Sequence, residues 1–315
     1  METNLGNFGR VGVLMGGPSS ERRISLQSGK AVYESLMGQG LDVVAIDVET
    51  DNWQQNYKLI EDAQINVAFI ALHGSFGEDG QIQALLEELK IPYTGSDPVA
   101  SRLAMDKVAS KEIFQKKALP VPNYFVISSR GDSQAYPRII ADLTPPFVVK
   151  PAKQGSSIGL SIVKKKEELE QAIAHAFDFD EQVIVEQYIP GREITVGILG
   201  GLTLPIVEII PQNKFYDYEA KYTPGRSEYI VPADLPIEVA AEVQGVAHKA
   251  HQSLGCFGLS RTDIRLNPDN KPFVLEVNSI PGLTLTSLLP KAAKASGFIF
   301  SQLCIHLLRL AYERS

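Results

Sequence analysis

The segment LSRTDIRLNPDNKPFVLEVN, residues 259–278, contains two runs of alternating apolar and polar residues separated by a short polar stretch. Alternation with a period of two is typical of β-strands, and the intervening Asn-Pro-Asp-Asn is a turn signal. The segment therefore predicts a β-hairpin with strands at 259–266 and 273–278.

The predicted hairpin brings two carboxylates together. If it is centred on its Asp-Asn pair without a bulge, Asp263 faces Glu276, and Arg261 faces Asn278. Like charges on facing residues, whose Cβ atoms lie about 5 Å apart, are destabilising. Under the same register the opposite, apolar face carries Ile264, Leu266, Leu275 and Val277.

A hard cation held by Asp263, Glu276 and Asn278 would remove this repulsion. So small a set of oxygen ligands favours Mg²⁺, with phosphate oxygens and water completing the coordination. The alternative is a solvated polar face on which Arg261 bridges the two carboxylates.

Length and composition restrict the class of protein. The chain has 315 residues, of which 44% are hydrophobic, and a net charge of −7. The charge argues against a general nucleic-acid binder, and no apolar run reaches the roughly 20 residues of a membrane span. The start, METNLGNFGR, has no apolar signal region, and Cys256 and Cys304 lack a CxxC spacing. We therefore expect a cytoplasmic protein without nucleic-acid or membrane partners.

The chain is predicted to form an α/β unit followed by two α+β units. Apolar runs at 11–15, 43–48 and 67–72 alternate with helix-length segments, as in an open parallel sheet whose ligands bind at the carboxyl ends of its strands. A single helix is expected at 101–118. The predicted boundaries are 1–103, 104–189 and 190–315.

The stretch VKPAKQGSSIG, residues 149–159, combines a strand, Lys150 and a loop of small residues. Backbone N–H groups and the hydroxyls of Ser156 and Ser157 could cradle phosphates there, with the lysine adding a point charge. Neither a Walker A nor a GxGxxG motif is present. A flexible hairpin loop is the alternative interpretation.

Two further segments resemble parts of a binding site. Glu186-Gln-Tyr-Ile189 precedes Pro-Gly and could offer backbone groups to adenine, with Glu193 at the ribose; an ordinary connection between domains would look the same. Residues 215–222, rich in polar aromatics, could form a lid or merely a surface loop.

Taken together, these motifs occur in the order expected of an ATP-grasp ligase, and nearly the whole chain resembles the D-alanine–D-alanine ligase family. The matching stretches are 16–25 (GGPSSERRIS), 73–80 (HGSFGEDG), 105–107, 149–159, 191–195, 215–222, 258–263 and 275–282. The resemblance implies a three-domain ATP-grasp architecture with the nucleotide between the central and C-terminal domains. It also implies ATP-dependent joining of two D-alanines, through a D-alanyl phosphate and a tetrahedral intermediate, for peptidoglycan precursors.

The resemblance also implies roles for individual residues. The ATP site would contain Lys107, Lys150, Ser157, Glu186, Ile189, Glu193 and Lys221. Asp263, Glu276 and Asn278 would hold two Mg²⁺ (or Mn²⁺) ions. In the substrate site, Glu21 would bind the ammonium of the first D-alanine, and Ser156 and Tyr222 would hydrogen-bond with Glu21. Arg261 and the Gly282 N–H would form the oxyanion hole. Ser287 and Leu288 would hold the carboxylate of the second D-alanine.

Several points stay open at this stage. His73 is a candidate base for the attacking amine, with a structural role as the alternative. A D-alanine–D-lactate ligase is the competing enzyme, although the lid residue Tyr222 favours the dipeptide product. A nucleotide-binding protein that has lost catalysis is the competing class. The family suggests a homodimer.

Overall fold

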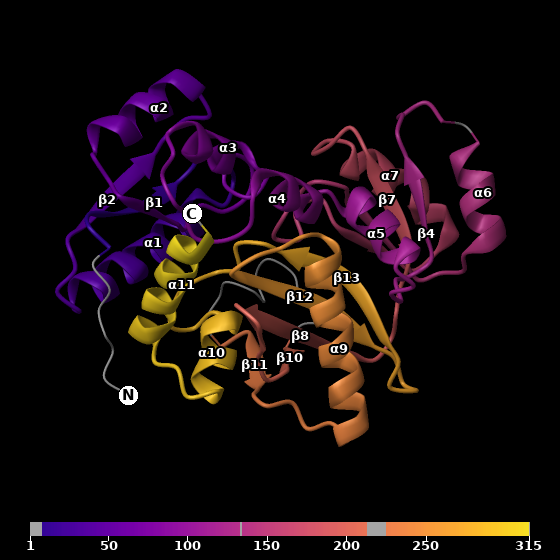
Figure 1. Ribbon diagram of the computed structural model, residues 1–315. Helices are drawn as coiled ribbons and strands as arrows, with labels where there is room; N and C mark the ends of the chain where they lie inside the picture. The colour runs from indigo at the N-terminus through magenta and orange to yellow at the C-terminus, as the bar shows by residue number, and fades with distance from the viewer. Residues whose placement is uncertain (1–7, 133, 213–224, 315) are drawn as a thin grey trace.

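The N-terminal part of the chain folds into a parallel three-stranded sheet, as its apolar runs predict. The structure, a computed structural model, describes residues 8–132, 134–212 and 225–314. The strand order of this first sheet is β2-β1-β3, with α1 and the C-terminal helix α11 on one face and α2 and α3 on the other (Figure 1). Its elements are β1 (Val11–Gly16), α1 (Arg22–Met37), β2 (Val43–Val48), α2 (Trp53–Asp62), β3 (Val67–Ile70) and α3 (Gln81–Glu88).

Two short helices lead away from this sheet, where a single long helix was predicted. That prediction is wrong because Asp106 has an extended backbone, with φ −85° and ψ 101°, that ends α4 (Pro98–Met105). The Asp106 side chain accepts hydrogen bonds from the N–H groups of Val108 and Ala109, and so begins α5 (Lys107–Lys116). An aspartate in this N-cap position satisfies donors that the helix itself leaves unpaired.

The second sheet is antiparallel, with strand order β4-β7-β5-β6. Its apolar face packs on α6 and α7 around Phe147 and Val185. The elements are β4 (Tyr124–Ile127), α6 (Ala135–Asp142), β5 (Phe147–Pro151), β6 (Ser161–Val163), the 3-10 turn η1 (Lys166–Glu168), α7 (Leu169–Ala176) and β7 (Val183–Gln187).

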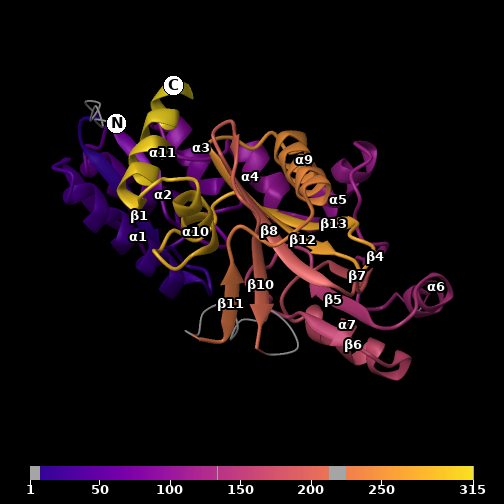
Figure 2. The same ribbon diagram turned by 90° about the horizontal axis from the view of Figure 1, so that it is seen from below.

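The third sheet is also antiparallel and has six strands, ordered β11-β10-β8-β12-β13, with β9 paired to β8. Helix α9 packs on its apolar face, so the other face of β12 and β13 is left for polar side chains. Seen from below, this sheet stands beside the central sheet (Figure 2). The elements are β8 (Arg192–Leu199), β9 (Leu202–Thr203), β10 (Val207–Pro211), β11 (Ser227–Ile230), α9 (Ile237–Ser253), β12 (Leu259–Leu266), β13 (Pro272–Asn278), α10 (Leu288–Ala295) and α11 (Phe300–Arg314).

The last helix returns to the first sheet. Helix α11 packs against α1, and both contribute to one core with strand β1 (Figure 1). The hydroxyl of Tyr312 donates to the carbonyl of Phe8 at 2.7 Å. Among the helices that the structure describes, none has the length and apolar character needed to cross a bilayer.

Candidate active site

The β12–β13 hairpin pairs the residues that the sequence pattern predicts. Asp263 faces Glu276 and Arg261 faces Asn278. The register then shifts, because Ile264 pairs with Val274 and leaves Leu275 as the extra residue of a bulge.

The bulge corrects one expectation about the faces of the hairpin. Leu275 does not belong to the apolar face; it lines a cavity, and Val274 is buried in the core in its place. Ile264, Leu266 and Val277 are buried in that core as predicted.

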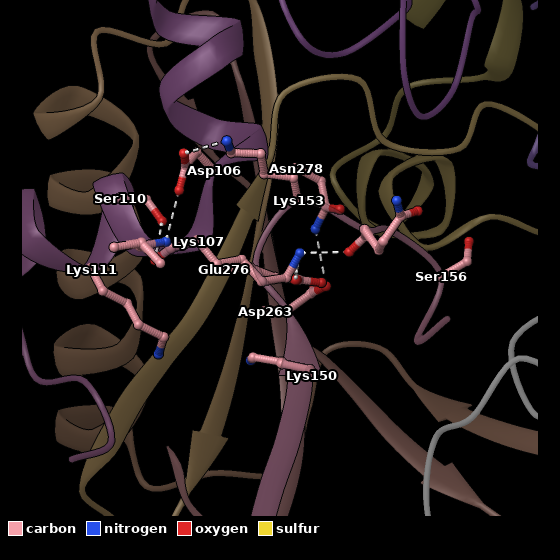
Figure 3. A network of polar contacts seen from close by, with 12 residues as sticks. Asp106, Lys107, Ser110, Lys111, Lys150, Lys153, Ser156, Asp263, Glu276 and Asn278 are labelled. Atoms are coloured by element: carbon pink, nitrogen blue, oxygen red, sulfur yellow. Dashed lines mark hydrogen bonds and ion pairs between the residues drawn. The ribbon is translucent and has the colours of Figure 1, made fainter. Parts of the chain in front are cut away.

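Protein cations hold both facing carboxylates. Arg261 forms two hydrogen bonds with Asp263, Nε to Oδ1 at 2.8 Å and Nη2 to Oδ2 at 2.7 Å. Lys107 Nζ lies 3.1 Å from Glu276 Oε2 and donates to the Gln154 carbonyl at 2.7 Å (Figure 3). Each of the two facing carboxylates therefore has a cationic side chain beside it.

The oxygen atoms at this position suit a hard cation. Asp263 also accepts from Thr195 Oγ1 at 2.6 Å and from Asn278 Nδ2 at 3.1 Å, so the three predicted metal ligands lie together (Figure 3). Across the described parts of the chain, no three His, Cys, Asp or Glu side chains cluster as a metal site. The donor set here is two carboxylates and an amide, which are ligands that Mg²⁺ accepts.

A cavity of about 740 Å³ lies between the central and C-terminal sheets. This volume is within the usual range for a small-molecule site. Strands β5 and β7 supply one wall, and β8, β10, β12 and β13 supply the other. It brings together eight of the predicted nucleotide and metal residues: Lys107, Lys150, Ser157, Glu186, Ile189, Glu193, Asp263 and Glu276.

Arg265, which the sequence reasoning missed, organises the connection between the two sheets. Its guanidinium donates to the carbonyls of Ile189 and Gly191 at 3.1 and 2.8 Å and to Glu193 Oε2 at 3.1 Å. It also lies 5.6 Å from the ring centroid of Tyr188. Since side chains two apart on a strand share a face, its position two residues after Asp263 was the available signal.

A smaller pocket of about 190 Å³ adjoins the first cavity. The hydroxyl of Ser156 donates to Glu21 Oε1, which joins the central loop to the N-terminal unit. Ser156 and Ser157 both have positive φ, 52° and 60°, so this loop follows a backbone path that few residues adopt. The predicted substrate residues that line the pocket are Glu21, His73, Ser156, Arg261, Gly282, Ser287 and Leu288.

The start of α10 points its backbone toward this pocket. Ser287 is the N-cap residue, with extended backbone, and Leu288 is the first helical residue. Ser287 Oγ accepts the Thr284 N–H at 3.1 Å, which fixes the loop that contains Gly282. The N–H groups at a helix start favour anions such as a carboxylate.

His73 is buried and held through its ring. Nε2 lies 3.0 Å from Ser28 Oγ, and the ring also hydrogen-bonds to the Ile280 backbone. Burial lowers the pKa of His73, so the ring is neutral near pH 7. Because Ser28 Oγ accepts the Leu283 N–H at 3.3 Å, the imidazole supports the loop beside Gly282.

Glu78 is a second residue that the sequence reasoning missed. It lines the smaller pocket, and Oε2 accepts the Gly74 N–H at 2.7 Å. Burial, and then the negative charge of Glu21, raise the pKa of Glu78 from 4.5 to about 8. Its only sequence signal was membership of the HGSFGEDG loop that already suggested ligand binding.

Two predicted residues, Lys221 and Tyr222, lie outside the described residues, as does the whole aromatic segment 215–222. Their predicted roles at the transferred phosphate and in the lid stay predictions.

Comparison with known proteins gives consistent relatives. The model for the D-ala D-ala ligase C-terminus matches residues 113–309, and that for the N-terminus matches residues 49–96. D-alanine–D-alanine ligases of Geotalea uraniireducens and Desulforudis audaxviator are each 47% identical, covering 96% and 97% of this chain and 95% and 99% of theirs.

Solved structures agree. D-alanine–D-alanine ligase from Bacillus anthracis complexed with ATP has a TM-score of 0.86 and 33% identity, covering 97% of this chain and 98% of that one. The VanG D-Ala:D-Ser ligase from Enterococcus faecalis has a TM-score of 0.82 and 31% identity, covering 96% and 99%.

Proposed function

The chain belongs to the D-alanine–D-alanine ligase family, and we propose that it joins two D-alanine molecules with hydrolysis of ATP to ADP and phosphate. The dipeptide product would enter peptidoglycan synthesis. The observation that carries this proposal is the pair of adjoining cavities, one of nucleotide size and one small and polar, with Lys107 and Glu276 lining both.

In the larger cavity, ATP would lie between the two antiparallel sheets. The ammonium groups of Lys107 and Lys150 would contact phosphates, with Ser157 contributing from the loop and Lys221 at the transferred phosphate. The hinge at Glu186 and Ile189 would hold adenine, and Glu193 the ribose. The relative from Bacillus anthracis, solved with ATP, supports nucleotide binding by this fold.

Asp263, Glu276 and Asn278 would hold two Mg²⁺ (or Mn²⁺) ions. When bound, these ions would supply positive charge that stabilises the phosphoryl group in transfer. Lys107 and Arg261 now neutralise the same carboxylates, so both cationic side chains would then become available to the substrates.

In the smaller pocket, Glu21 would bind the ammonium of the first D-alanine, with Ser156 and Tyr222 closing the loop over it. A carboxylate oxygen of that D-alanine would attack the γ-phosphorus of ATP; the bond to the bridging oxygen breaks and ADP leaves. The product is a D-alanyl phosphate, which water would hydrolyse if the site were open.

The second D-alanine would bind with its carboxylate at Ser287 and Leu288, at the start of α10. Its amine, after losing a proton, would attack the acyl carbon. Arg261 and the Gly282 N–H would stabilise the tetrahedral oxyanion, and the carbon–oxygen bond to phosphate then breaks. The arrangement of His73, with both ring contacts directed at the protein, supports positioning of the Gly282 loop rather than proton removal.

Two other functions compete. A D-alanine–D-lactate ligase would need no proton removal from the second substrate, and Tyr222 argues against it; VanG is a D-Ala:D-Ser ligase of the same fold, so the second substrate needs a direct test. A binding protein without catalysis is disfavoured because Arg261, Asp263 and Glu276 are all present and close together.

We also propose that the protein is a homodimer that acts in the cytoplasm. Its two buried free cysteines support a reducing compartment.

The test is product formation by the purified protein with ATP and Mg²⁺. ADP release should require D-alanine, and mass spectrometry should find D-alanyl-D-alanine, with L-alanine as the negative control. No ADP release with D-alanine would overturn the proposal. Formation of D-alanyl-D-lactate in place of the dipeptide, when D-lactate is supplied with D-alanine at neutral pH, would favour the depsipeptide ligase instead.

A further inference from the structure

Helix α5 places two lysines on one face, one helical turn apart. Lys107 and Lys111 are separated by four residues, the spacing at which helical side chains are neighbours. Lys107 reaches Glu276, whereas Lys111 is fully buried, with Nζ 2.9 Å from Glu186 Oε2. A buried lysine is costly unless its charge is compensated, so the position needs an explanation.

The second oxygen of Glu186 is also occupied. Lys150 Nζ donates to Glu186 Oε1 at 2.7 Å, and Glu186 is 2% exposed. The three side chains therefore form one buried row with two positive charges and one negative charge, reaching the wall of the larger cavity (Figure 3 shows both lysines).

The electrostatics of this row favour an ionised carboxylate. Burial works to raise the pKa of Glu186, but the neighbouring Lys111 and Lys150 outweigh it and hold that pKa below its ordinary value. Burial lowers the pKa of Lys111, and Glu186 opposes part of that change. Lys111 also lies 5.5 Å from the ring centroid of Tyr124.

We propose that Lys111 is a positioning residue for ATP, which neutralises Glu186 so that Lys150 keeps its positive charge for the nucleotide phosphates. This rests on the proposed function, in which Lys150 contacts phosphate. Without Lys111, Lys150 and Glu186 form a closed neutral pair. Moving Lys150 toward a phosphate would then leave a buried carboxylate without compensation.

Lys111 acts on the nucleotide only through its neighbours. Among the described residues that line the two cavities, Lys150 and Glu186 are present and Lys111 is absent. Its removal should therefore affect nucleotide affinity and leave the D-alanine pocket unchanged.

The test compares Lys111→Met with Lys111→Arg in the full-length protein. Lys111→Met should raise the KM for ATP and the Kd of a non-hydrolysable ATP analogue about tenfold, equivalent to 1.4 kcal/mol. The kcat and the KM for D-alanine should change by less than about threefold. General damage to the fold would instead alter these values together with the ATP parameters. Lys111→Arg should restore most of the affinity. Lys116→Met, an exposed position on the same helix, is the matched control and should behave as wild type.

A double-mutant cycle tests whether the effect passes through Glu186. In a Glu186→Gln background, Lys111→Met should not weaken binding of the ATP analogue further, because there is no carboxylate left to neutralise. Wild-type affinity in Lys111→Met, equal losses in the methionine and arginine variants, or additive losses in the cycle would each overturn the proposal. These readouts measure nucleotide binding, so they are separate from the D-alanine requirement that tests the proposed reaction. If Lys111→Met alone does not fold, the comparison of Glu186→Gln with the Glu186→Gln/Lys111→Met double variant still decides the question, because a further loss of affinity in the double variant would overturn the proposal.

Discussion

Replacing Arg261 with lysine should separate catalysis from nucleotide binding. The arginine lines the smaller pocket, and it is absent from the described lining of the larger one. Lysine keeps a positive charge but cannot form the two parallel hydrogen bonds that Arg261 makes with Asp263 at 2.8 and 2.7 Å.

The size of the effect follows from these contacts. Loss of one oxyanion donor typically lowers kcat by about 10²–10³. Asp263 keeps its bonds from Thr195 and Asn278, so the loss of folding stability should be about 1–3 kcal/mol. ATP affinity should change by less than about threefold, because Arg261 does not line the nucleotide cavity.

Arg265→Lys is the matched control on the same strand. Arg265 lines the larger cavity and holds the carbonyls of Ile189 and Gly191, so this change should raise the KM for ATP about tenfold with a smaller effect on kcat. Coupled ADP release and calorimetric titration with an ATP analogue would measure both variants. A tenfold loss of ATP affinity in Arg261→Lys, with kcat nearly unchanged, would refute the assignment of Arg261 to the smaller pocket chemistry.

Four further changes test other parts of the site. Glu21→Gln should raise the KM for D-alanine by about tenfold or more, measured by dipeptide formation, because the substrate ammonium loses a charge-assisted hydrogen bond; an unchanged KM would place the first ammonium elsewhere. Ser28→Ala should cost about 1–3 kcal/mol in urea unfolding, because His73 and the Leu283 N–H lose their partner. The raised pKa of Glu78 means that, between about pH 4.5 and pH 8, the folded state holds a proton that the unfolded state has released. The free energy of unfolding should therefore fall as the pH rises through this range, by up to a few kcal/mol. Glu78→Gln should flatten that decline, and an identical pH profile in the variant would contradict the assignment. Asp106→Ala should lower stability by about 1 kcal/mol through loss of the α5 cap, seen as a lower thermal midpoint.

The strands were the most predictable part of the fold. Buried parallel strands read as continuous apolar runs, as β1 and β3 do, and the half-exposed edge strand β2 also lies where the sequence placed it. Helices α2, α6 and α10 were missed, and α6 and α10 each carry a proline as the third residue, Pro137 and Pro290. Proline discourages a helix prediction, yet it is tolerated in the first turn, where its missing N–H has no partner to lose.

Side chains placed by tertiary packing were the least predictable part of the site. The facing of Asp263 and Glu276 followed from strand periodicity, whereas the bulge that moves Leu275 into the cavity has no local signal in an apolar stretch. Lys111 and Arg265 gain their importance from partners far away in sequence, Glu186 and Glu193. Spacing within one segment cannot reveal contacts of that kind.

The return of α11 to α1 has a consequence for how ligands enter. The first strand, β1, and the last helix, α11, share one core, and Tyr312 hydrogen-bonds to Phe8. The N- and C-terminal sheets are therefore held together as a single frame. The central sheet has its own core outside that frame; the chain enters it after α5 and leaves it before β8, and Ser156 of its loop hydrogen-bonds to Glu21 of the N-terminal unit. We therefore expect nucleotide to enter and ADP to leave by movement of this one lobe, while the N- and C-terminal sheets, joined by their shared core, stay together.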